Sequence, residues 1–446
     1  MTRKFWTLAA AMIFSCILSP LAFGQANYDE SKVGTYQLPD PLVCLDGTAV
    51  KTAEQWEKVR RPEILEMFQR EMFGRLPKEL IEAGNHPDFV TFKVFESSND
   101  ALGGKAIRKQ VEITFHELDY AKTKKDSGRE VKANLLIYIP KNAEGPVPAF
   151  LGCNFLGNHT ITPEKEIALF HLRNGSMPKD DKNLKPEDSR GYRVNRWDVD
   201  QILDAGYALA TLHYMDVTFD ERDGIGTGIF SLYGDSKATE ERTPDAWGSI
   251  TAWAWGLSRA LDYLETDEHI DASRVAVMGH SRLGKTSLWA GASDPRFAVV
   301  ISNNSGCGGS ALSRRNYGET LTIINRNFPH WFAKNFRQYN ADPNTLPIDE
   351  HELIALMAPR PVYVASAKED RWADPKGEYL SVYHAVPVYE LYGEKPFDGL
   401  SEPAQPAVDQ PVFGKKMGYH IRTGGHDVKS YDWTQYIRFA DQFLKK

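Results

Sequence analysis

The stretch VAVMGHSRLGKTSLWAG (275–291) decides the fold of this chain. A strand-like apolar run leads straight into a short turn at Ser281, and a helix-forming segment follows. A serine at such a strand–turn–helix elbow is held above the edge of a sheet with its hydroxyl exposed. The usual elbow reads G-x-S-x-G, whereas here the second glycine, Gly284, comes one place late and Leu283 takes its position. We predict that Ser281 is a nucleophile; the alternative is that it caps the helix.

Strand and helix patterns alternate around this elbow. Short runs rich in β-branched and aromatic residues predict strands, and longer segments with apolar residues at helical spacing predict helices. This alternation is typical of a mostly parallel, doubly wound sheet. The predicted strands are ALATLHY (208–214), VAVMG (275–279), AVVIS (298–302), PVYVAS (361–366) and PVYELYG (387–393), and the predicted helices are 247–264, the segment after Ser281 and 433–444.

The earlier part of the chain has a different pattern. Residues 25–50 are polar and contain proline, so we expect an arm that wraps the domain. A helical stretch from Thr52 follows, with Pro62 at a kink or break. Four strand-like runs then predict an antiparallel start to the sheet, at 90–95, 107–116, 133–140 and 147–152.

These patterns predict an α/β protein. Its architecture is a three-layer αβα sandwich with a mostly parallel central sheet and an antiparallel N-terminal start. Connections without strand patterns at 155–200, 214–246 and 305–355 are longer than a compact domain needs, so we expect them to cover or build a site. We predict a single catalytic domain over 25–446 that consists of the wrapping arm, the sandwich and these inserted loops.

Composition excludes several classes of protein. The 446 residues include 53 Lys+Arg and 60 Asp+Glu, a formal charge of -7, which does not suit a protein built around nucleic-acid phosphates. A hydrophobic content of 42% supports a large core and excludes wholesale disorder. The 4 Cys are too few for a disulfide scaffold, and no pair has metal-ligand spacing. We expect no metal site on these cysteines, and the serine chemistry considered below needs neither a metal nor an organic cofactor.

The first 24 residues have the pattern of an export signal. A basic start is followed by an apolar run, and small residues at Ala22 and Gly24 precede a predicted cleavage after Gly24. A membrane anchor is the weaker interpretation because the apolar run is short and broken by polar residues and a proline. The mature chain is thus expected to be secreted or periplasmic. Its remaining cysteines are Cys44, Cys153 and Cys307, and a bridge between the last two stays open.

The general base is predicted in IRTGGHDV (421–428). His426 follows a strand-like run and two glycines, and it precedes the last helix, which fits the chain order serine, acid, histidine. A neutral imidazole can take the serine proton near neutral pH and return it to a leaving alcohol. His420 is the nearby competitor, but it lies within the strand-like run and fits a packed residue better.

The triad acid is predicted after the strand at 361–366, in AKEDRWADP. Asp370 lies a few residues past the strand end, where a carboxylate can reach the histidine. Glu369 and Asp374 are the alternatives, and Asp374, which precedes Pro375, also suits a residue that fixes the turn. The other candidate region, after the strand at 298–302, carries asparagines and no acid.

Several long motifs run through the chain: FLGCNFLGNHT (150–160), WGSITAWAWGLSRALDYLETD (247–267), GHSRLGK (279–285), NNSGCGGSALSRRNYGE (303–319), NFPHWF (327–332), LIALMAPRPVYVASAKEDRWADPKGEYL (353–380) and TGGHDV (423–428). Together they resemble the bacterial glucuronoyl esterases, carbohydrate esterase family fifteen of the α/β-hydrolase superfamily. The resemblance implies an esterase that cleaves the bond between a glucuronic acid branch of xylan and an alcohol of lignin.

The same resemblance implies roles for individual residues. Ser281 would be the nucleophile and His426 the base, and Arg282 would offer its backbone N–H and its guanidinium to the oxyanion. Fungal members carry the acid at the place of Asn304, so this chain resembles the bacterial members that use the EDRWADP segment, which favours Asp370. The residues implied to contact the sugar are Lys285, Glu319 and Trp372.

Each implied contact also has a structural alternative. Arg282 and Lys285 suit solvated helix cations, Glu319 suits an ion pair with Arg314 or Arg315, and an isolated tryptophan such as Trp372 is usually part of a core. Trp331 is a second candidate pocket wall, and Arg193 and Arg196 are weaker candidates.

Other functions stay open at this point. An acetyl-xylan or other carbohydrate esterase would share the scaffold, because fold alone does not set the substrate. A serine peptidase would have no use for Lys285 and Glu319, and a non-catalytic carbohydrate-binding relative would not need the intact set Ser281, Asp370 and His426.

Overall fold

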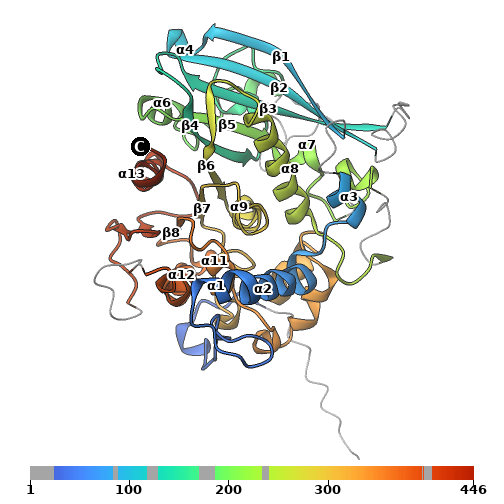
Figure 1. Ribbon diagram of the computed structural model, residues 1–446, viewed down its shortest axis with the longest axis vertical. Helices are drawn as coiled ribbons and strands as arrows, with labels where there is room; N and C mark the ends of the chain where they lie inside the picture. The colour runs from blue at the N-terminus through green and yellow to red at the C-terminus, as the bar shows by residue number, and fades with distance from the viewer. Residues whose placement is uncertain are drawn as a thin grey trace, which may run out of the picture.

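One mixed sheet runs through the molecule (Figure 1). The computed structural model describes residues 25–83, 89–117, 129–169, 186–222, 224–233, 241–393, 395 and 404–445, and the expected export signal lies outside them. Within these residues the sheet has ten strands. They are β1 (Val90–Asp100), β2 (Ala106–His116), β3 (Glu130–Pro140), β4 (Val147–Asn154), β5 (Ala208–His213), β6 (Ile270–His280), β7 (Val299–Asn303), β8 (Val362–Ala367), β9 (Val412–Phe413) and β10 (Met417–Arg422).

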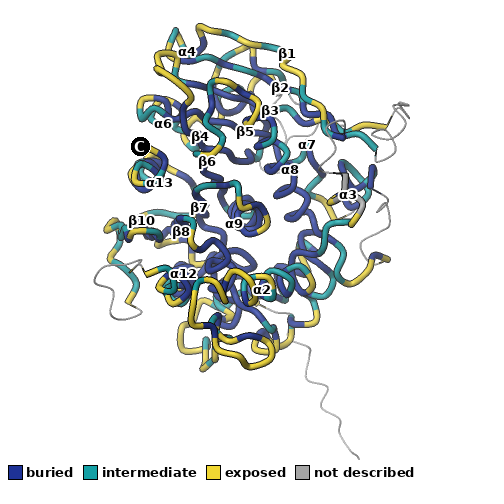
Figure 2. The backbone as a smooth tube through the Cα atoms, viewed as in Figure 1, coloured by how far each residue is buried: buried dark blue, intermediate teal, exposed yellow. Residues whose placement is uncertain are grey.

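The strand order is β1-β2-β3-β5-β4-β6-β7-β8-β10-β9. The pairs β1–β2, β2–β3 and β3–β5 are antiparallel, and every pair from β5 through β4, β6, β7 and β8 to β10 is parallel. This confirms the mostly parallel centre and, for β1, β2 and β3, the predicted antiparallel start. The fourth run expected in that start is wrong, because β4 is parallel to both of its neighbours, β5 and β6. In the parallel part, β7 is buried along its whole length, whereas β1 at the edge is largely exposed (Figure 2).

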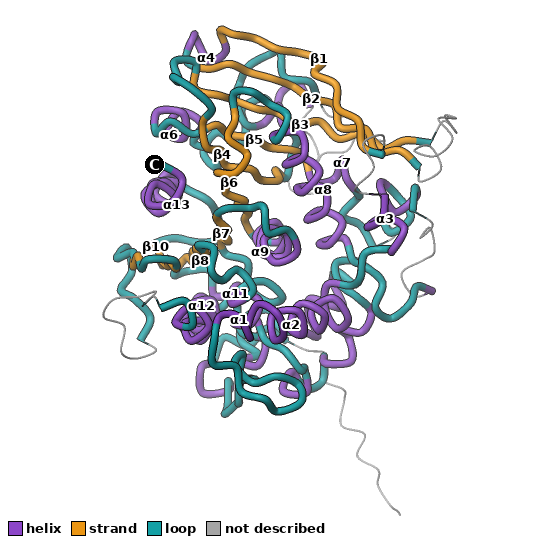
Figure 3. The backbone as a smooth tube through the Cα atoms, in the orientation of Figure 1, coloured by secondary structure: helices purple, strands orange, loops and turns teal. Residues whose placement is uncertain are grey.

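Helices cover both faces of the sheet (Figure 3), which confirms the three-layer αβα sandwich. Alternate strand residues point to opposite faces: Val277 and Val300 share a core with α8 and α9, whereas Met278 and Ile301 share one with α13. α6 lies on the same face as α13, and α12 on the face of α8 and α9. These helices are α6 (Val199–Asp204), α8 (Ser249–Leu264), α9 (Arg282–Ser293), α12 (Pro375–Glu390) and α13 (Ser430–Leu444).

The helical segment at 53–73 packs against the C-terminal end of α9 and against α11 (Glu350–Ala355), where Arg61 donates to the Ala292 carbonyl at 2.9 Å and to the Leu356 carbonyl at 3.2 Å. Pro62 stands at the start of a helix, as the missing N–H of proline allows, and wider π-type turns flank that helix on both sides. Arg60 donates to the buried Glu352 at 2.9 Å, which ties this segment to α11. The remaining helices are α1 (Ala53–Gln55), α2 (Arg61–Phe68), α3 (Lys78–Ala83), α4 (Ala101–Gly104), α7 (Tyr214–Val217), α10 (Leu321–Asn327) and α11 (Glu350–Ala355).

The predicted strand at 387–393 is wrong, because most of this segment is the last turn of α12. Val382, Ala385, Val388 and Tyr389 recur at helical spacing and are all buried in the core. Packing of this face outweighs the local β-propensity of PVYELYG, and Pro387 is accommodated within the helix.

Among the described residues, Cys44, Cys153 and Cys307 are buried free thiols, so the bridge left open between Cys153 and Cys307 does not form. Among the described residues, no helix has both the length and the apolar character needed to cross a membrane.

Candidate active site

Ser281 sits at the sharp turn between β6 and α9. Its backbone has φ 58° and ψ −129°, a strained combination for a residue with a side chain, and its N–H donates to the Asn303 carbonyl at 2.9 Å. A Cβ on Gly279 would lie 1.9 Å from the Leu283 carbonyl oxygen, so only glycine fits before the turn. The Ser281 side chain does not cap α9. The geometry is that of an elbow presenting its hydroxyl, and the capping alternative is excluded.

The displaced glycine of the elbow has its own packing reason. A Cβ on Gly284 would lie 2.9 Å from the Ser305 Cβ and 3.1 Å from the Ser302 hydroxyl. The first turn of α9 therefore lies close against the chain that leaves β7. Gly284 serves this contact, whereas the turn itself depends on Gly279.

Arg282 is the first residue of α9, so its backbone N–H has no carbonyl partner within the helix and points out of the helix N-terminus. Its guanidinium donates to the Asp220 carboxylate and lies 4.8 Å from the centre of the Trp331 ring. The side chain is therefore held in the site by a charge partner and an aromatic wall. It is not a solvated surface cation.

Asp220 was not recognised in the sequence. Its side chain is buried and accepts hydrogen bonds from the Trp331 indole at 2.6 Å and the Tyr214 hydroxyl at 2.9 Å, and it contacts His330 at 2.9 Å. Burial alone would raise its pKa, but Arg282 and the other donors hold that pKa below the usual value, so Asp220 is an anion. It lies in one of the long connections expected to build a site, but no local pattern distinguishes it from other acids there.

His426 and Asp370 meet above the ends of β8 and β10. His426 Nδ1 lies 2.6 Å from Asp370 Oδ2, which also accepts from the Asn304 amide at 2.8 Å. Asp370 is 5% exposed, whereas the His426 side chain is 40% exposed. A buried carboxylate thus orients an accessible imidazole and leaves its Nε2 free toward the cavity.

The two competing acids point elsewhere. Asp374 caps α12 through the Gly377 N–H at 3.0 Å and pairs with the buried Arg315 at 2.8 Å. Glu369 is exposed. Of the three acids considered for this loop, the structure places only Asp370 against His426.

Two histidines near His426, His420 and His280, are packed residues. His420 is fully buried between Asp432, at 2.8 Å, and the Tyr363 hydroxyl, at 2.9 Å. His280 contacts the Asn303 side chain at 2.6 Å, and its ring centre lies 4.5 Å from that of His426. Burial holds the pKa of His280 well below its usual value, so it stays neutral beside His426.

A cavity of about 270 Å³ opens beside Ser281 and His426. Lys285 is buried in its wall, where the ammonium donates to the Ser305 carbonyl. Burial raises the pKa of the Glu319 carboxyl and lowers that of Lys285, while the two charges oppose these shifts by attracting each other. The lining residues are Ser281, Arg282, Lys285, Asn304, Ser305, Gly306, Glu319, Asn327, Phe328, Trp331, Trp372, Ala373 and His426.

Trp372 is not a core residue, and Glu319 does not form the ion pair with Arg314 or Arg315 that was the alternative to a sugar contact. Trp372 is 39% exposed at the mouth of the cavity and is not part of the core. Arg314 and Arg315 pair with Asp349 and Asp374, and Glu319 faces the cavity. Trp331, the second predicted wall, also lines it.

Of the two weaker candidates, Arg196 donates to Asp427 at 2.6 Å, next to His426, and Arg193 lies over the exposed Tyr192 ring at 4.7 Å. Neither lines the cavity.

A chain of buried hydrogen bonds holds the loop that contributes Ser305 and Gly306 to the cavity lining. Glu378 of α12 accepts from the Gly306 N–H at 2.9 Å and the Ser310 hydroxyl at 2.8 Å, and Ser310 contacts the Ser305 hydroxyl at 2.7 Å. Because Ser305 supplies the carbonyl bound by Lys285, this chain fixes the loop that positions the buried cation.

Three comparisons place the chain among known proteins. Residues 194–393 match the family model described as glucuronyl esterase, fungi. The carbohydrate esterase MZ0003 of an unknown prokaryotic organism is 46% identical over 94% of this chain and 92% of its own length. The chain belongs to the glucuronoyl esterases of carbohydrate esterase family 15.

Two further relatives support this family. The 4-O-methyl-glucuronoyl methylesterase 1 of Wolfiporia cocos is 37% identical over 82% of this chain and 74% of its own length. A solved glucuronoyl esterase structure from Solibacter usitatus has a TM-score of 0.81 and 43% identity, and covers 93% of this chain and 99% of that one. The predicted family and α/β-hydrolase fold are confirmed, and the protein is a carboxylic ester hydrolase.

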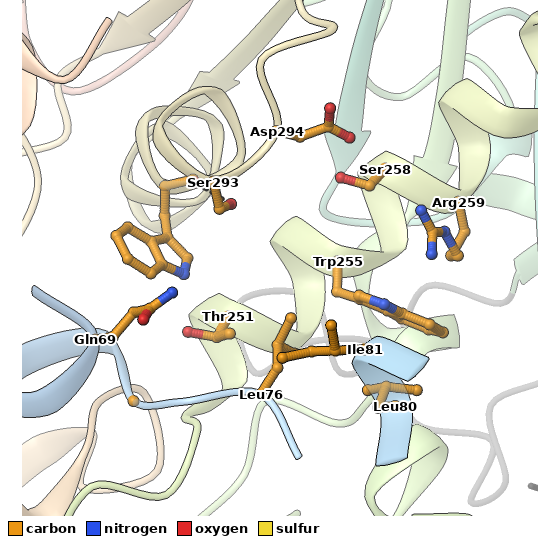
Figure 4. Close-up of a pocket in the computed structure, with 12 residues that line it drawn as sticks. Gln69, Leu76, Leu80, Ile81, Thr251, Trp255, Ser258, Arg259, Ser293 and Asp294 are labelled. Atoms are coloured by element: carbon orange, nitrogen blue, oxygen red, sulfur yellow. Dashed lines mark hydrogen bonds between the residues drawn. The ribbon is translucent and has the colours of Figure 1, made fainter. Parts of the chain in front are cut away.

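A second cavity of this glucuronoyl esterase, of about 210 Å³, lies between α8, α9 and the chain after α2 (Figure 4). Trp255 and Arg259 of α8 and Gln69 form parts of its wall. It contains none of the predicted site residues and no paired nucleophile and base. In this it differs from the cavity at Ser281, which is lined by both Ser281 and His426.

Proposed function

We propose that this glucuronoyl esterase is an exported serine esterase that hydrolyses 4-O-methyl-glucuronoyl esters between xylan branches and lignin alcohols. The observation that carries the proposal is the cavity itself, which places Lys285, Glu319 and Trp372 beside the Ser281 elbow and the His426–Asp370 pair. This protein's relatives include a 4-O-methyl-glucuronoyl methylesterase.

In the proposed acylation step, His426 Nε2 takes the proton from the Ser281 hydroxyl as the Oγ attacks the ester carbon. The carbonyl oxygen becomes an oxyanion beside the Arg282 N–H and guanidinium, whose positive charge favours the transition state over the neutral ester. The intermediate then collapses. The alcohol leaves with the proton from His426, and the uronic acid stays bound to Ser281 as an ester.

In the second step, His426 takes a proton from water, and the hydroxide attacks the glucuronoyl ester. The Ser281–acyl bond breaks, the proton returns to Ser281, and the free uronic acid leaves as a carboxylate. Asp370 stabilises the imidazolium in both steps and keeps its Nδ1–H directed away from the substrate. No step calls for a metal or an organic cofactor.

The polar wall supports a uronic acid over acetate. A buried cation and a buried carboxyl, Lys285 and Glu319, would have no partner in a methyl group, and leaving such groups unmatched costs binding energy. With a sugar bound, Lys285 and Glu319 can hydrogen-bond its hydroxyls, and Trp372 offers an aromatic surface to its apolar face.

Substrate comparison tests the proposal. We expect the benzyl ester of glucuronic acid to be hydrolysed with a higher kcat/KM than an aryl acetate, and a galacturonate ester to report on the hydroxyl contacts. Ser281→Ala should abolish turnover of all three. An acetate preference would contradict the substrate class, and full activity in Ser281→Ala would contradict the mechanism. Export is tested separately, by mass analysis of the secreted protein, which we expect to begin after Gly24.

A further inference from the structure

An exposed aromatic surface lies beside the mouth of the cavity. It consists of Tyr28, Tyr317 and Arg371, which we call the Tyr28 platform. The two tyrosine rings meet edge to face with their centres 6.3 Å apart, and the Arg371 guanidinium lies 5.1 Å from the Tyr28 ring centre and 6.0 Å from that of Tyr317. Tyr28 is 42% exposed. Three separate segments thus converge on one surface cluster.

Hydrogen bonds hold the platform in place. Arg371 Nε donates to the Tyr317 hydroxyl at 3.0 Å, and its Nη2 donates to the Tyr28 carbonyl. In the arm, the Asn27 carbonyl accepts from the Gly318 N–H at 2.7 Å, and Glu30 pairs with Arg315 at 2.7 Å. The aromatic rings are therefore fixed before any ligand arrives, which lowers the entropic cost of binding.

The Tyr28 platform adjoins the part of the cavity lining that is predicted to contact the sugar, at Glu319 and Trp372. Tyr317 and Arg371 are each one or two residues from a lining residue, Glu319 and Trp372, and the Glu319 N–H donates to the Trp372 carbonyl at 2.9 Å. A Cβ on Gly318 would lie 2.3 Å from that same carbonyl oxygen, so the two segments touch. A ligand that extends past Trp372 meets the platform next.

The cavity lining reaches solvent at its exposed residues. They are His426, Trp372 and Asn327. In the proposed mechanism the leaving alcohol takes its proton from His426 and departs on that side. The proposed sugar contacts, Lys285, Glu319 and Trp372, then direct the glycosidic substituent out of the cavity away from His426.

We propose that the Tyr28 platform binds the pyranose chain that carries the uronic acid, and that the N-terminal arm is thereby part of the polysaccharide site. This inference rests on the proposed function. Aromatic faces suit the apolar faces of pyranose rings, and an arginine beside them can donate to sugar hydroxyls. An aryl alcohol would also suit aromatic residues, but it belongs on the His426 side.

The test compares two benzyl esters, that of free glucuronic acid and that of glucuronic acid linked to xylotriose. In the wild type we expect a higher kcat/KM for the oligosaccharide ester. Tyr28→Ala and Arg371→Ala should lower the oligosaccharide-to-monosaccharide ratio about threefold to tenfold, as expected for the loss of an aromatic contact. Phe95→Ala, which removes a similarly exposed ring, 41%, from the edge strand β1, should leave the ratio unchanged.

Four results would overturn the inference. The oligosaccharide-to-monosaccharide ratio could be unity in the wild type, or it could be unaffected in Tyr28→Ala. It could also fall in Asn327→Ala instead, which would show that the oligosaccharide leaves the cavity past Asn327. A change in the preference between benzyl and methyl esters of free glucuronic acid in Tyr28→Ala would assign the platform to the alcohol and also overturn it. Absence of activity on the monosaccharide ester would instead contradict the proposed function.

Discussion

The His426 imidazole and the Asp370 carboxylate approach to 2.6 Å, although 55 residues separate them in the sequence. Asp370 is buried and takes a second hydrogen bond from Asn304, so its position is fixed from two sides. The asparagine stands where fungal members were expected to carry the acid. In this chain it orients an acid contributed by the neighbouring strand, β8.

This arrangement predicts different outcomes for the two aspartates of the loop. Asp370→Asn should lower kcat by about 10²- to 10⁴-fold with little change in KM, because the imidazolium loses its counter-charge and its fixed tautomer. Asp374→Asn should mainly lower thermal stability, because Asp374 caps α12 and pairs with Arg315. Steady-state kinetics and thermal unfolding of both variants provide the check. If Asp374→Asn lost more kcat than Asp370→Asn, the acid would be misassigned.

The Arg282–Asp220 pair predicts an effect from a residue outside the triad. Asp220→Asn keeps the shape but removes the charge that holds the guanidinium, and misplacing a catalytic group typically costs about 10²-fold in rate. We expect this loss in kcat for uronate and acetate esters alike. Asp216→Asn is the matched control, because Asp216 pairs with His213 away from the cavity. Equal kinetics in the two variants would remove Asp220 from the mechanism.

The buried Lys285 predicts that kcat/KM falls at alkaline pH for one class of ester and not for another. Burial lowers the pKa of this ammonium, so the cation is present at lower pH and is lost as the pH rises, before an ordinary lysine would titrate. kcat/KM for the glucuronate ester should fall on this alkaline limb, while aryl acetate turnover should not follow it. In Lys285→Arg the limb should disappear, because arginine stays charged. An identical limb for both esters would argue against a role for Lys285 in sugar binding.

Glu378 predicts a pH dependence of stability. Burial raises the pKa of Glu378 from 4.5 to about 8, so the folded state holds this proton more tightly than the unfolded state. The resulting stabilisation is complete below pH 4.5 and is lost as the pH rises to about 8. In urea titrations over this range, Glu378→Gln should show a smaller fall in the free energy of unfolding than the wild type. Glu390→Gln, exposed at the end of the same helix, is the control, and parallel wild-type and Glu378→Gln curves would contradict the assignment.

Local sequence patterns predicted the two elements that carry Ser281 and His426. The run into Ser281 carries its own strand, turn and helix, and the loop at His426 has a strand before it and a helix after it. PVYELYG was mispredicted because the core contacts of α12 come from distant segments. Asp220 was missed for the same reason: its partners Arg282, His330 and Trp331 are 62 to 111 residues away.

The residues proposed to contact the sugar could not be predicted from local sequence patterns. Nothing near Lys285 or Glu319 distinguishes either from a surface charge, and only the resemblance to a family indicated a role. Their burial in one cavity depends on the loop after β7, which Glu378 and three serines fix through buried hydrogen bonds.

The central claim is that Ser281 carries the uronic acid through the reaction. The most direct measurement is rapid acid quenching of the enzyme with a 4-nitrophenyl ester of glucuronic acid, followed by peptide mass mapping. We predict a glucuronoyl adduct on the peptide that contains Ser281, formed with a burst of 4-nitrophenol, and neither adduct nor turnover in Ser281→Ala. An adduct on another residue, or turnover retained in Ser281→Ala, would contradict the account.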